Sequence, residues 1–125
     1  MNEIKNEIWK DIDGFISYQV SSLGRVASFK GKRKILQPAP TGEARKYLAL
    51  HLCKNKKRVN CKIHRLVYFA FNPDVSKDND VHHVNKNTFD NRIENLVGIN
   101  KKEHTKMHAK EKIYINKIKN WDNLF

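Results

Sequence analysis

Hydrophobic and polar positions alternate along the first half of the chain in short runs, and turn-forming residues separate these runs. Residues 18–20 and 25–29 form one pair of runs, and residues 47–53 and 58–63 form a second pair. Alternation with a period of two is typical of strands that bury one face. Residues 38–42, with two prolines and a glycine, are expected to break regular structure between the two pairs. The pattern therefore predicts two antiparallel β-hairpins.

A denser apolar segment follows the second hairpin. Residues 64–71 hold the largest concentration of apolar side chains, and Asn72 and Pro73 end the run. We predict a helix here that forms the centre of the core. Near the N-terminus, Trp9 is also expected to pack in the core rather than to stack on a base.

A polar connector leads from this helix to a segment rich in histidine. His82 and His83 end a short apolar run, and polar residues 85–88 are expected to form a turn. The apolar-rich residues 92–99 are then suited to a returning strand. Asn100 is a good helix N-cap, with Glu103 placed as in a capping box. The order of elements is two strands and a helix.

Such a helix would place His104 and His108 one turn apart on a single face. Alone, this spacing is more often structural or accidental than a metal site. The pair His82 and His83, at a distance that a hairpin can span, favours a metal site formed by His82, His104 and His108. Adjacent strand residues point to opposite faces. One of the two can therefore bind metal while the other faces the substrate.

Charge narrows the choice of partners. The chain carries 25 Lys and Arg against 13 Asp and Glu, a net charge of +12, which favours a polyanion. DNA, RNA and an acidic membrane surface all fit the charge alone, but no apolar run approaches the roughly 18 residues of a membrane span. No signal-peptide core is seen, and Cys53 and Cys61 suit free thiols. We expect a cytoplasmic protein that binds nucleic acid and no membrane.

Several basic residues cluster in predicted turns, where the alternatives are a solvated surface and contact with a phosphate backbone. The candidates for DNA contact are Arg25, Lys32, Arg33, Lys34, Lys56, Lys57 and Arg92.

The segment from residue 80 to residue 108 resembles the HNH nuclease motif, the ββα-metal site of phage homing endonucleases and colicin-type nucleases. The matching residues are His82, His83, Asn95, His104 and His108, and residues 90–96 (DNRIENL) resemble the homing group. Two further phrases, EIWKDIDGF and YQVSSLGRVAS, resemble a small N-terminal module that often accompanies HNH domains.

The resemblance implies a role for each matching residue. His83 would be the general base that activates water, and Asn95 would brace the hairpin loop that aims it. His82, His104 and His108 would hold one divalent ion, where many homing members carry Asp or Asn. Imidazole ligands favour Zn, Ni or Mn, whereas Mg prefers oxygen, so the ion with the highest affinity need not support turnover.

We therefore predict an α+β protein, with N-terminal antiparallel β hairpins and one core helix followed by a C-terminal ββα-metal unit. Residues 1–72 would form a DNA-binding module and residues 73–125 the nuclease unit. The predicted function is a metal-dependent DNA endonuclease, a phage homing or nicking enzyme, acting as a monomer or homodimer. The main alternative is a non-catalytic DNA-binding protein with a structural metal module. An RNA-binding module is favoured by net charge alone.

Overall fold

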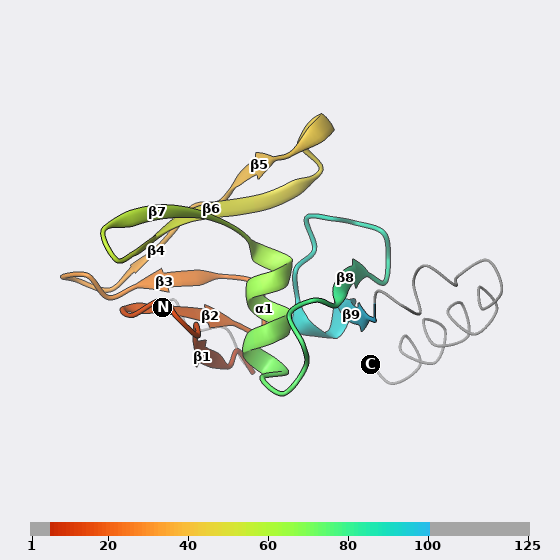
Figure 1. Cartoon of the computed structure of the whole chain (residues 1–125), viewed down its shortest axis with the longest axis horizontal. Helices are drawn as coiled ribbons and strands as arrows, with labels where there is room; N and C mark the ends of the chain where they lie inside the picture. The colour runs from red at the N-terminus through yellow and green to blue at the C-terminus, as the bar shows by residue number, and fades with distance from the viewer. Residues whose placement is uncertain (1–5, 101–125) are drawn as a thin grey trace, which may run out of the picture.

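The computed structural model describes residues 6–100 of the chain, which form short antiparallel sheets around one helix (Figure 1). The strands are β1 (Trp9–Asp11), β2 (Tyr18–Ser21), β3 (Val26–Ser28), β4 (Lys34–Ile35), β5 (Ala39–Thr41), β6 (Tyr47–Lys54), β7 (Lys57–Lys62), β8 (Asp80–His83) and β9 (Leu96–Ile99). The helix is α1 (Ile63–Phe71), and two 3₁₀ turns are η1 (Glu43–Arg45) and η2 (Ile93–Asn95). The predicted α+β class, with antiparallel sheets and one core helix, is confirmed for the described residues.

The first sheet has the strand order β1-β2-β3-β4. Its centre is the predicted hairpin, in which Val20 pairs with Val26 and both side chains are buried. The turn between β2 and β3 requires a residue with positive φ, and Gly24 supplies it with a φ of 88°. The Gly24 N–H donates to the Ser21 carbonyl at 3.0 Å, which closes the turn.

The second sheet has the order β5-β6-β7 and contains the second predicted hairpin. Cys61 pairs with Leu50 and Cys53 pairs with Arg58, so the two cysteines do not face each other and both are free thiols. The expected break at residues 38–42 is wrong, because β5 lies within it. Pro40 is tolerated there because β5 is an edge strand. Backbone N–H groups on the outer side of an edge strand have no partner strand, so a residue without an N–H can be accommodated.

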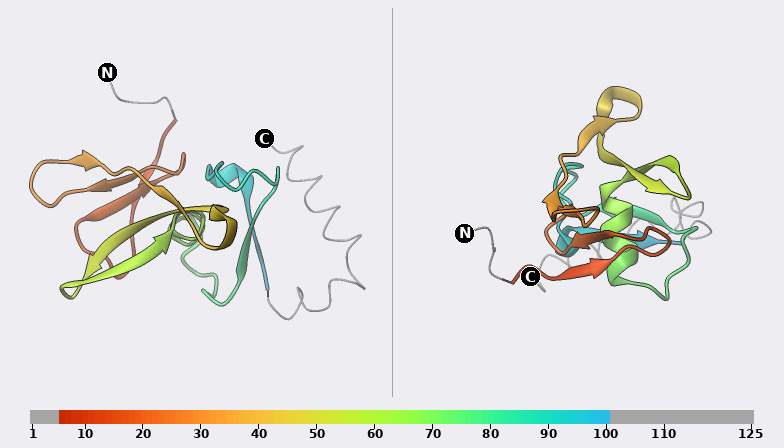
Figure 2. Two further views of the ribbon diagram at one scale, coloured as in Figure 1. Left: turned by 90° about the horizontal axis from the view of Figure 1, so that it is seen from above. Right: turned by 90° about the vertical axis from the view of Figure 1, so that its left-hand side faces the viewer.

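The predicted helix is confirmed as α1, which contacts strands of all three sheets. Figure 2 shows it between the two N-terminal sheets and the β8–β9 pair. Val67 is fully buried, and the core around it also contains Ile12, Tyr18, Val20, Val26, Leu50, Leu52, Ile63, Val81 and Leu96. Helix α1 ends at Phe71, one residue before the predicted division at residue 72. The core nevertheless includes side chains from both sides of that division.

The third sheet is the β8–β9 pair, in which His83 lies opposite Leu96 and His82 opposite Val97. The strand expected over residues 92–99 is wrong in its first part, because η2 precedes β9. The cause is Asn95, whose buried side chain bonds back to the loop and holds the chain in a turn there. The helix expected after Asn100 lies outside the described residues.

Trp9 does not join the core, which corrects a third expectation. It is partly exposed, and the guanidinium groups of Arg25 and Arg33 lie 5.5 Å and 4.9 Å from its ring. Over residues 6–100, no helix is long and apolar enough to cross a membrane.

Candidate functional site

His82 and His83 end β8 and differ in exposure, as expected for neighbours on a strand. His83 is 8% exposed, while His82 is half-buried. The Nε2 atom of His83 lies 2.7 Å from Oδ1 of Asn91, within hydrogen-bond distance. Burial lowers the pKa of His83, and the hydrogen bond to Asn91 and the charge of Asp90 oppose this shift only in part. The imidazole therefore stays neutral near pH 7 and can accept a proton.

A stack of rings packs against His83. Its ring centroid lies 5.0 Å from that of His64 and 6.2 Å from that of Tyr47, and Tyr47 and His64 stack at 5.1 Å. His64, at the start of α1, is 6% exposed, and burial is the main cause that lowers its pKa to about 3. A neutral, buried His64 forms the wall behind His83.

Asn95 ties the loop between β8 and η2 together. Its Oδ1 accepts from the backbone N–H of Asn85 at 3.0 Å, and its Nδ2 donates to the Asn85 side chain at 3.0 Å. The same Nδ2 donates to the Asp90 carbonyl at 2.8 Å, and the Val84 N–H donates to the Asn95 carbonyl at 2.8 Å. With 4% exposure, Asn95 is a buried amide bonded to both ends of the loop that follows His83.

Two residues near His83 were absent from the sequence-based site, Asn91 and Tyr47. Asn91 lies in a polar loop that contains several asparagines, and nothing in the sequence singles it out. Tyr47 comes from the start of β6, and only the fold brings it close to His83.

The described part of the chain supplies one of the three predicted metal ligands. Among residues 6–100, three or more His, Cys, Asp or Glu side chains nowhere come together as a metal site. His82 is on β8, whereas His104 and His108 lie outside the described residues. All three predicted ligands are imidazoles, which in the neutral form are suitable donors for a divalent ion.

The predicted DNA-contacting residues fall into two groups. Lys32 and Arg33 in the β3–β4 loop are exposed, as is Lys34 at the start of β4. Lys56 in the β6–β7 turn and Lys57 at the start of β7 are exposed as well. Figure 1 shows both turns at the end of the molecule opposite β8 and β9, and Figure 2 agrees. We call these five residues the basic tips.

Arg25 and Arg92 form the second group, because each is bonded to an acid. Arg25 Nε donates to Glu7 Oε2 at 2.8 Å, and its Nη2 bonds the other oxygen of the same carboxylate. Arg92 donates to Asp90 at 2.8 Å and to Glu94 at 2.7 Å. These acids offset the charge that either arginine would present to a phosphate.

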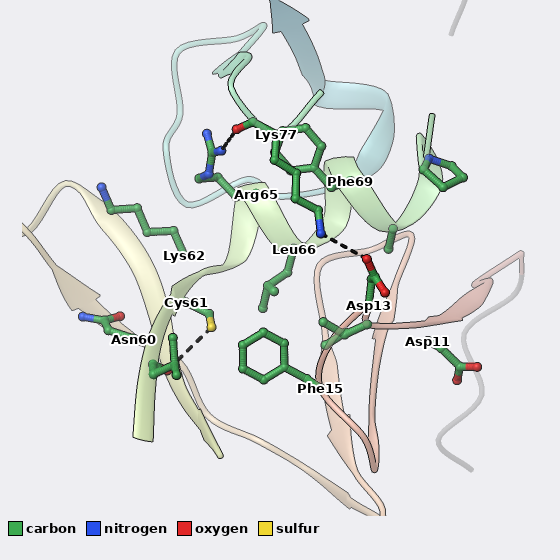
Figure 3. Close-up of a pocket in the computed structure, with 14 residues that line it drawn as sticks. Asp11, Asp13, Phe15, Asn60, Cys61, Lys62, Arg65, Leu66, Phe69 and Lys77 are labelled. Atoms are coloured by element: carbon green, nitrogen blue, oxygen red, sulfur yellow. Dashed lines mark hydrogen bonds and ion pairs between the residues drawn. The ribbon is translucent and has the colours of Figure 1, made fainter. Parts of the chain in front are cut away.

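A separate cavity of about 540 Å³ lies between α1, β7 and the loops around Asp13 and Lys77. Figure 3 shows Phe15, Leu66 and Phe69 on its wall and the Lys77–Asp13 ion pair, which measures 3.2 Å. Of the predicted site residues within 6–100, none lines this cavity.

Comparison with known proteins identifies the class to which this fold and histidine pair belong. Residues 61–106 match the family model described as HNH endonuclease, and residues 7–61 match the NUMOD4 motif. The structure is similar to that of the HNH homing endonuclease I-HmuI, solved in a study of its DNA binding and cleavage. The two share 30% identity and a TM-score of 0.68, over 90% of this chain and 68% of the other. This chain belongs to the HNH endonuclease family.

Two viral relatives agree with this assignment. Uncharacterized HNH endonucleases of Acanthamoeba polyphaga mimivirus are 37% identical over 110 residues and 30% identical over 117 residues. These matches cover 84% and 91% of this chain but 26% and 34% of the relatives. The chain thus spans about a third or less of the length of the curated relatives that it matches.

Proposed function

We propose that this chain is a divalent-metal-dependent DNA endonuclease that hydrolyses phosphodiester bonds, as a phage-type homing or nicking enzyme. The observation that supports this most strongly is the state of His83. It is a buried imidazole at the end of β8, with a lowered pKa and one ring nitrogen bonded to Asn91. The likeness to I-HmuI, which binds and cleaves DNA, favours DNA as the substrate.

In this proposal His83 is the general base. Hydrolysis of a phosphodiester requires a nucleophile derived from water, and a neutral imidazole can remove the proton. The wall of His64 and Tyr47 covers one side of the ring and restricts its rotation. Asn95 holds the loop that leaves β8, so the backbone that carries His83 cannot shift independently.

The ion would be held by His82, together with His104 and His108. When bound there, a divalent cation would offset the negative charge that develops on the phosphate and on the leaving oxygen. Three neutral imidazoles would leave the full double charge of the ion available. Substitution of His82 should therefore lower both metal affinity and activity.

The basic tips would contact the DNA backbone away from the cut. Strand β6 begins at Tyr47, beside His83, and ends at Lys54, next to Lys56 and Lys57. At a rise of about 3.3 Å per residue, the two ends of this eight-residue strand lie roughly 23 Å apart. Because base pairs repeat every ~3.4 Å, the tips would contact phosphates about seven base pairs from the scissile bond. Residues 1–72 would then supply most of the DNA affinity and residues 73–125 the chemistry.

A supercoiled-plasmid assay tests the proposal. The wild-type chain and His83→Ala are incubated with Mg, Mn, Ni or Zn in turn, and nicked and linear products are separated on a gel. We expect product from the wild type only, with DNA binding of the variant retained. Cleavage by His83→Ala at the wild-type rate would disprove the assigned base. The ratio of nicked to linear product also reports whether one strand or two is cut.

The same assay evaluates the alternative, a non-catalytic DNA-binding protein with a structural metal module. That alternative predicts DNA and metal binding with no cleavage in any ion, on plasmids that carry a randomised library of target sequences. Product from the library would exclude it.

A further inference from the structure

Asn91 makes a direct contact with the proposed base. Its side chain is buried, with 5% exposure for the residue, and its Oδ1 lies 2.7 Å from His83 Nε2. A carbonyl oxygen only accepts hydrogen bonds, so the ring nitrogen that faces it carries the proton. A neutral imidazole has one N–H, which leaves the lone pair on Nδ1. The contact therefore selects the tautomer in which Nδ1 can act as the base.

Asn91 is itself held from the other side by the turn between β2 and β3. A Cβ added to Gly24 would meet Cβ and the carbonyl oxygen of Asn91, each at 3.0 Å, so the two backbones are in close contact. Two residues further along, the Ile93 N–H donates to the Ser22 carbonyl at 2.8 Å. The turn of the first sheet thus forms a surface against which the loop of the histidine pair rests.

The turn is well suited to this task because it is rigid. Ser21 Oγ accepts from the backbone N–H groups of Leu23 and Arg25, at 3.2 Å and 3.1 Å. The backbone N–H of Ser21 donates to the Arg25 carbonyl at 2.8 Å. Ser21 and Ser22 are both buried. A turn fixed by its own hydrogen bonds can transmit the position of the first sheet to Asn91.

We infer that Asn91 is a positioning residue for His83, and that the β2–β3 turn fixes Asn91 through its contact at Gly24. The N-terminal module would then have a second task besides DNA binding, since it aims the base of the nuclease unit. This inference rests on the proposed function, because it assigns the proton-accepting nitrogen of the proposed base. Tyr47 and His64 restrict the ring from another side.

A merely structural role of Asn91 makes a different prediction. If Asn91 served only to fill space and stabilise the loop, every replacement of similar size would act alike. If it positions His83, the acceptor oxygen decides the outcome. Asn91→Asp keeps an acceptor at the same place, whereas Asn91→Leu keeps the approximate volume and loses the acceptor.

The first experiment determines the tautomer of His83 and does not depend on DNA cleavage. Imidazole ¹⁵N spectra of the full-length chain are recorded at about pH 9, where histidines are neutral, and His83→Gln identifies the His83 signals. We expect Nε2–H in the wild type and in Asn91→Asp, and a mixture of tautomers in Asn91→Leu. An Nδ1–H tautomer in the wild type, or an unchanged tautomer in Asn91→Leu, would overturn the inference.

The second experiment measures single-turnover cleavage at saturating DNA. Asn91→Leu should lower the rate about 100-fold with DNA affinity unchanged, because a displaced base loses its alignment. Asn91→Asp should stay within about tenfold of the wild type. Equal losses in both variants would favour the structural role and contradict the inference. If the wild type cleaves no DNA, the proposed function fails, while the tautomer measurement still decides the role of Asn91.

Gly24→Ala tests the contact with the turn, and Gly42→Ala is its matched control. Both glycines have positive φ, 88° and 82°, but an added Cβ at Gly42 meets nothing within 4 Å. Both variants share the backbone strain, and only Gly24→Ala displaces Asn91. We expect a roughly tenfold slower rate for Gly24→Ala and a mixture of His83 tautomers. Equal rates in the two variants would remove the turn from the mechanism.

Discussion

The two ends of the molecule use polar side chains in opposite ways. At the basic tips the lysines and Arg33 are exposed, and they contribute charge rather than precise geometry. At the β8–β9 end, His83, Asn91 and Asn95 are 8%, 5% and 4% exposed and are hydrogen-bonded to one another or to the loop. Substitutions at the tips should therefore act in small, additive steps. Substitutions of these three buried residues should instead disrupt a connected network.

Asn95→Ala should have the largest effect, because it acts at the centre of the network at the histidine end. It removes three hydrogen bonds made by a buried amide, which predicts a loss of about 3 kcal/mol of unfolding free energy. Cleavage should also fall by about two orders of magnitude, because the loop that follows His83 is released. Urea unfolding and the plasmid assay measure the two effects.

Asn87→Ala is the matched control in the same loop. Asn87 is exposed, and its Oδ1 accepts from the Phe89 N–H at 3.1 Å. We expect a loss of at most about 1 kcal/mol and near-normal cleavage. If the two variants lose stability equally, the network at the histidine end is not the source of its rigidity.

Arg25, a predicted DNA contact, also has a structural partner within the described residues. The sequence placed it among the DNA contacts, but its partner Glu7 has a side chain that is 3% exposed. The hydrogen bond from Arg25 is the main cause that lowers the pKa of Glu7. Glu7→Gln should therefore reduce the unfolding free energy by about 2 kcal/mol near neutral pH.

The pH dependence of this loss has a definite sign. Because the pKa of Glu7 is lower in the folded than in the unfolded state, its stabilisation is complete above the unfolded pKa. It is then lost as the pH falls through the folded pKa. The stabilities of wild type and Glu7→Gln should converge in urea titrations carried from about pH 7 to about pH 3. A constant difference across that range would show that the ion pair is not responsible.

Most of the elements that the sequence predicted correctly contain several buried side chains, although β7, which was also predicted, is mostly exposed. Residues 18–20 and 47–53 alternate and form β2 and β6, and residues 64–71 form most of α1. Strands β1, β4 and β5 escaped prediction because they are two or three residues long and mostly exposed, so no alternation marks them. Their pairing is decided by neighbours in the sheet.

The same distinction applies to the site. The sequence could indicate His82 and His83 as candidate site residues because they are adjacent in a segment that resembles a known motif. Strand geometry then predicts that their side chains point to opposite faces of the sheet. The sequence could not indicate Tyr47 or Gly24, because each approaches the loop between β8 and β9 only through the packing of α1 and the sheets. The pairing of Arg25 with Glu7 likewise joins residues that lie far apart in the sequence. The roles of His104 and His108 remain predictions.

The double variant Lys56→Ala, Lys57→Ala tests the other end of the molecule. Loss of two phosphate contacts should weaken DNA binding about tenfold and lower the slope of log affinity against log salt by about two. The cleavage rate at saturating DNA should not change, because the tip lies roughly 23 Å from His83 along β6. Lys77→Ala, at an exposed lysine paired with Asp13, is the control. A slower saturated rate in the double variant would contradict the separation of binding from chemistry.

Arg92→Ala should have the smallest effect. It tests the contrast between the two ends of the molecule at a residue that shares features of both. Its side chain is 46% exposed, like a DNA contact, yet it bonds to both Asp90 and Glu94, like a member of the loop network. Exposed ion pairs contribute about 0–1 kcal/mol, so little stability should be lost. Because two acids already offset its charge, we expect a change in DNA affinity below about twofold and an unchanged slope of log affinity against log salt.

Filter-binding titrations of Arg92→Ala over a range of salt concentrations measure this slope, with the single variant Lys57→Ala as calibration. A decrease of about one, as expected for Lys57→Ala, would place Arg92 on a phosphate and extend the DNA-binding surface to the histidine end.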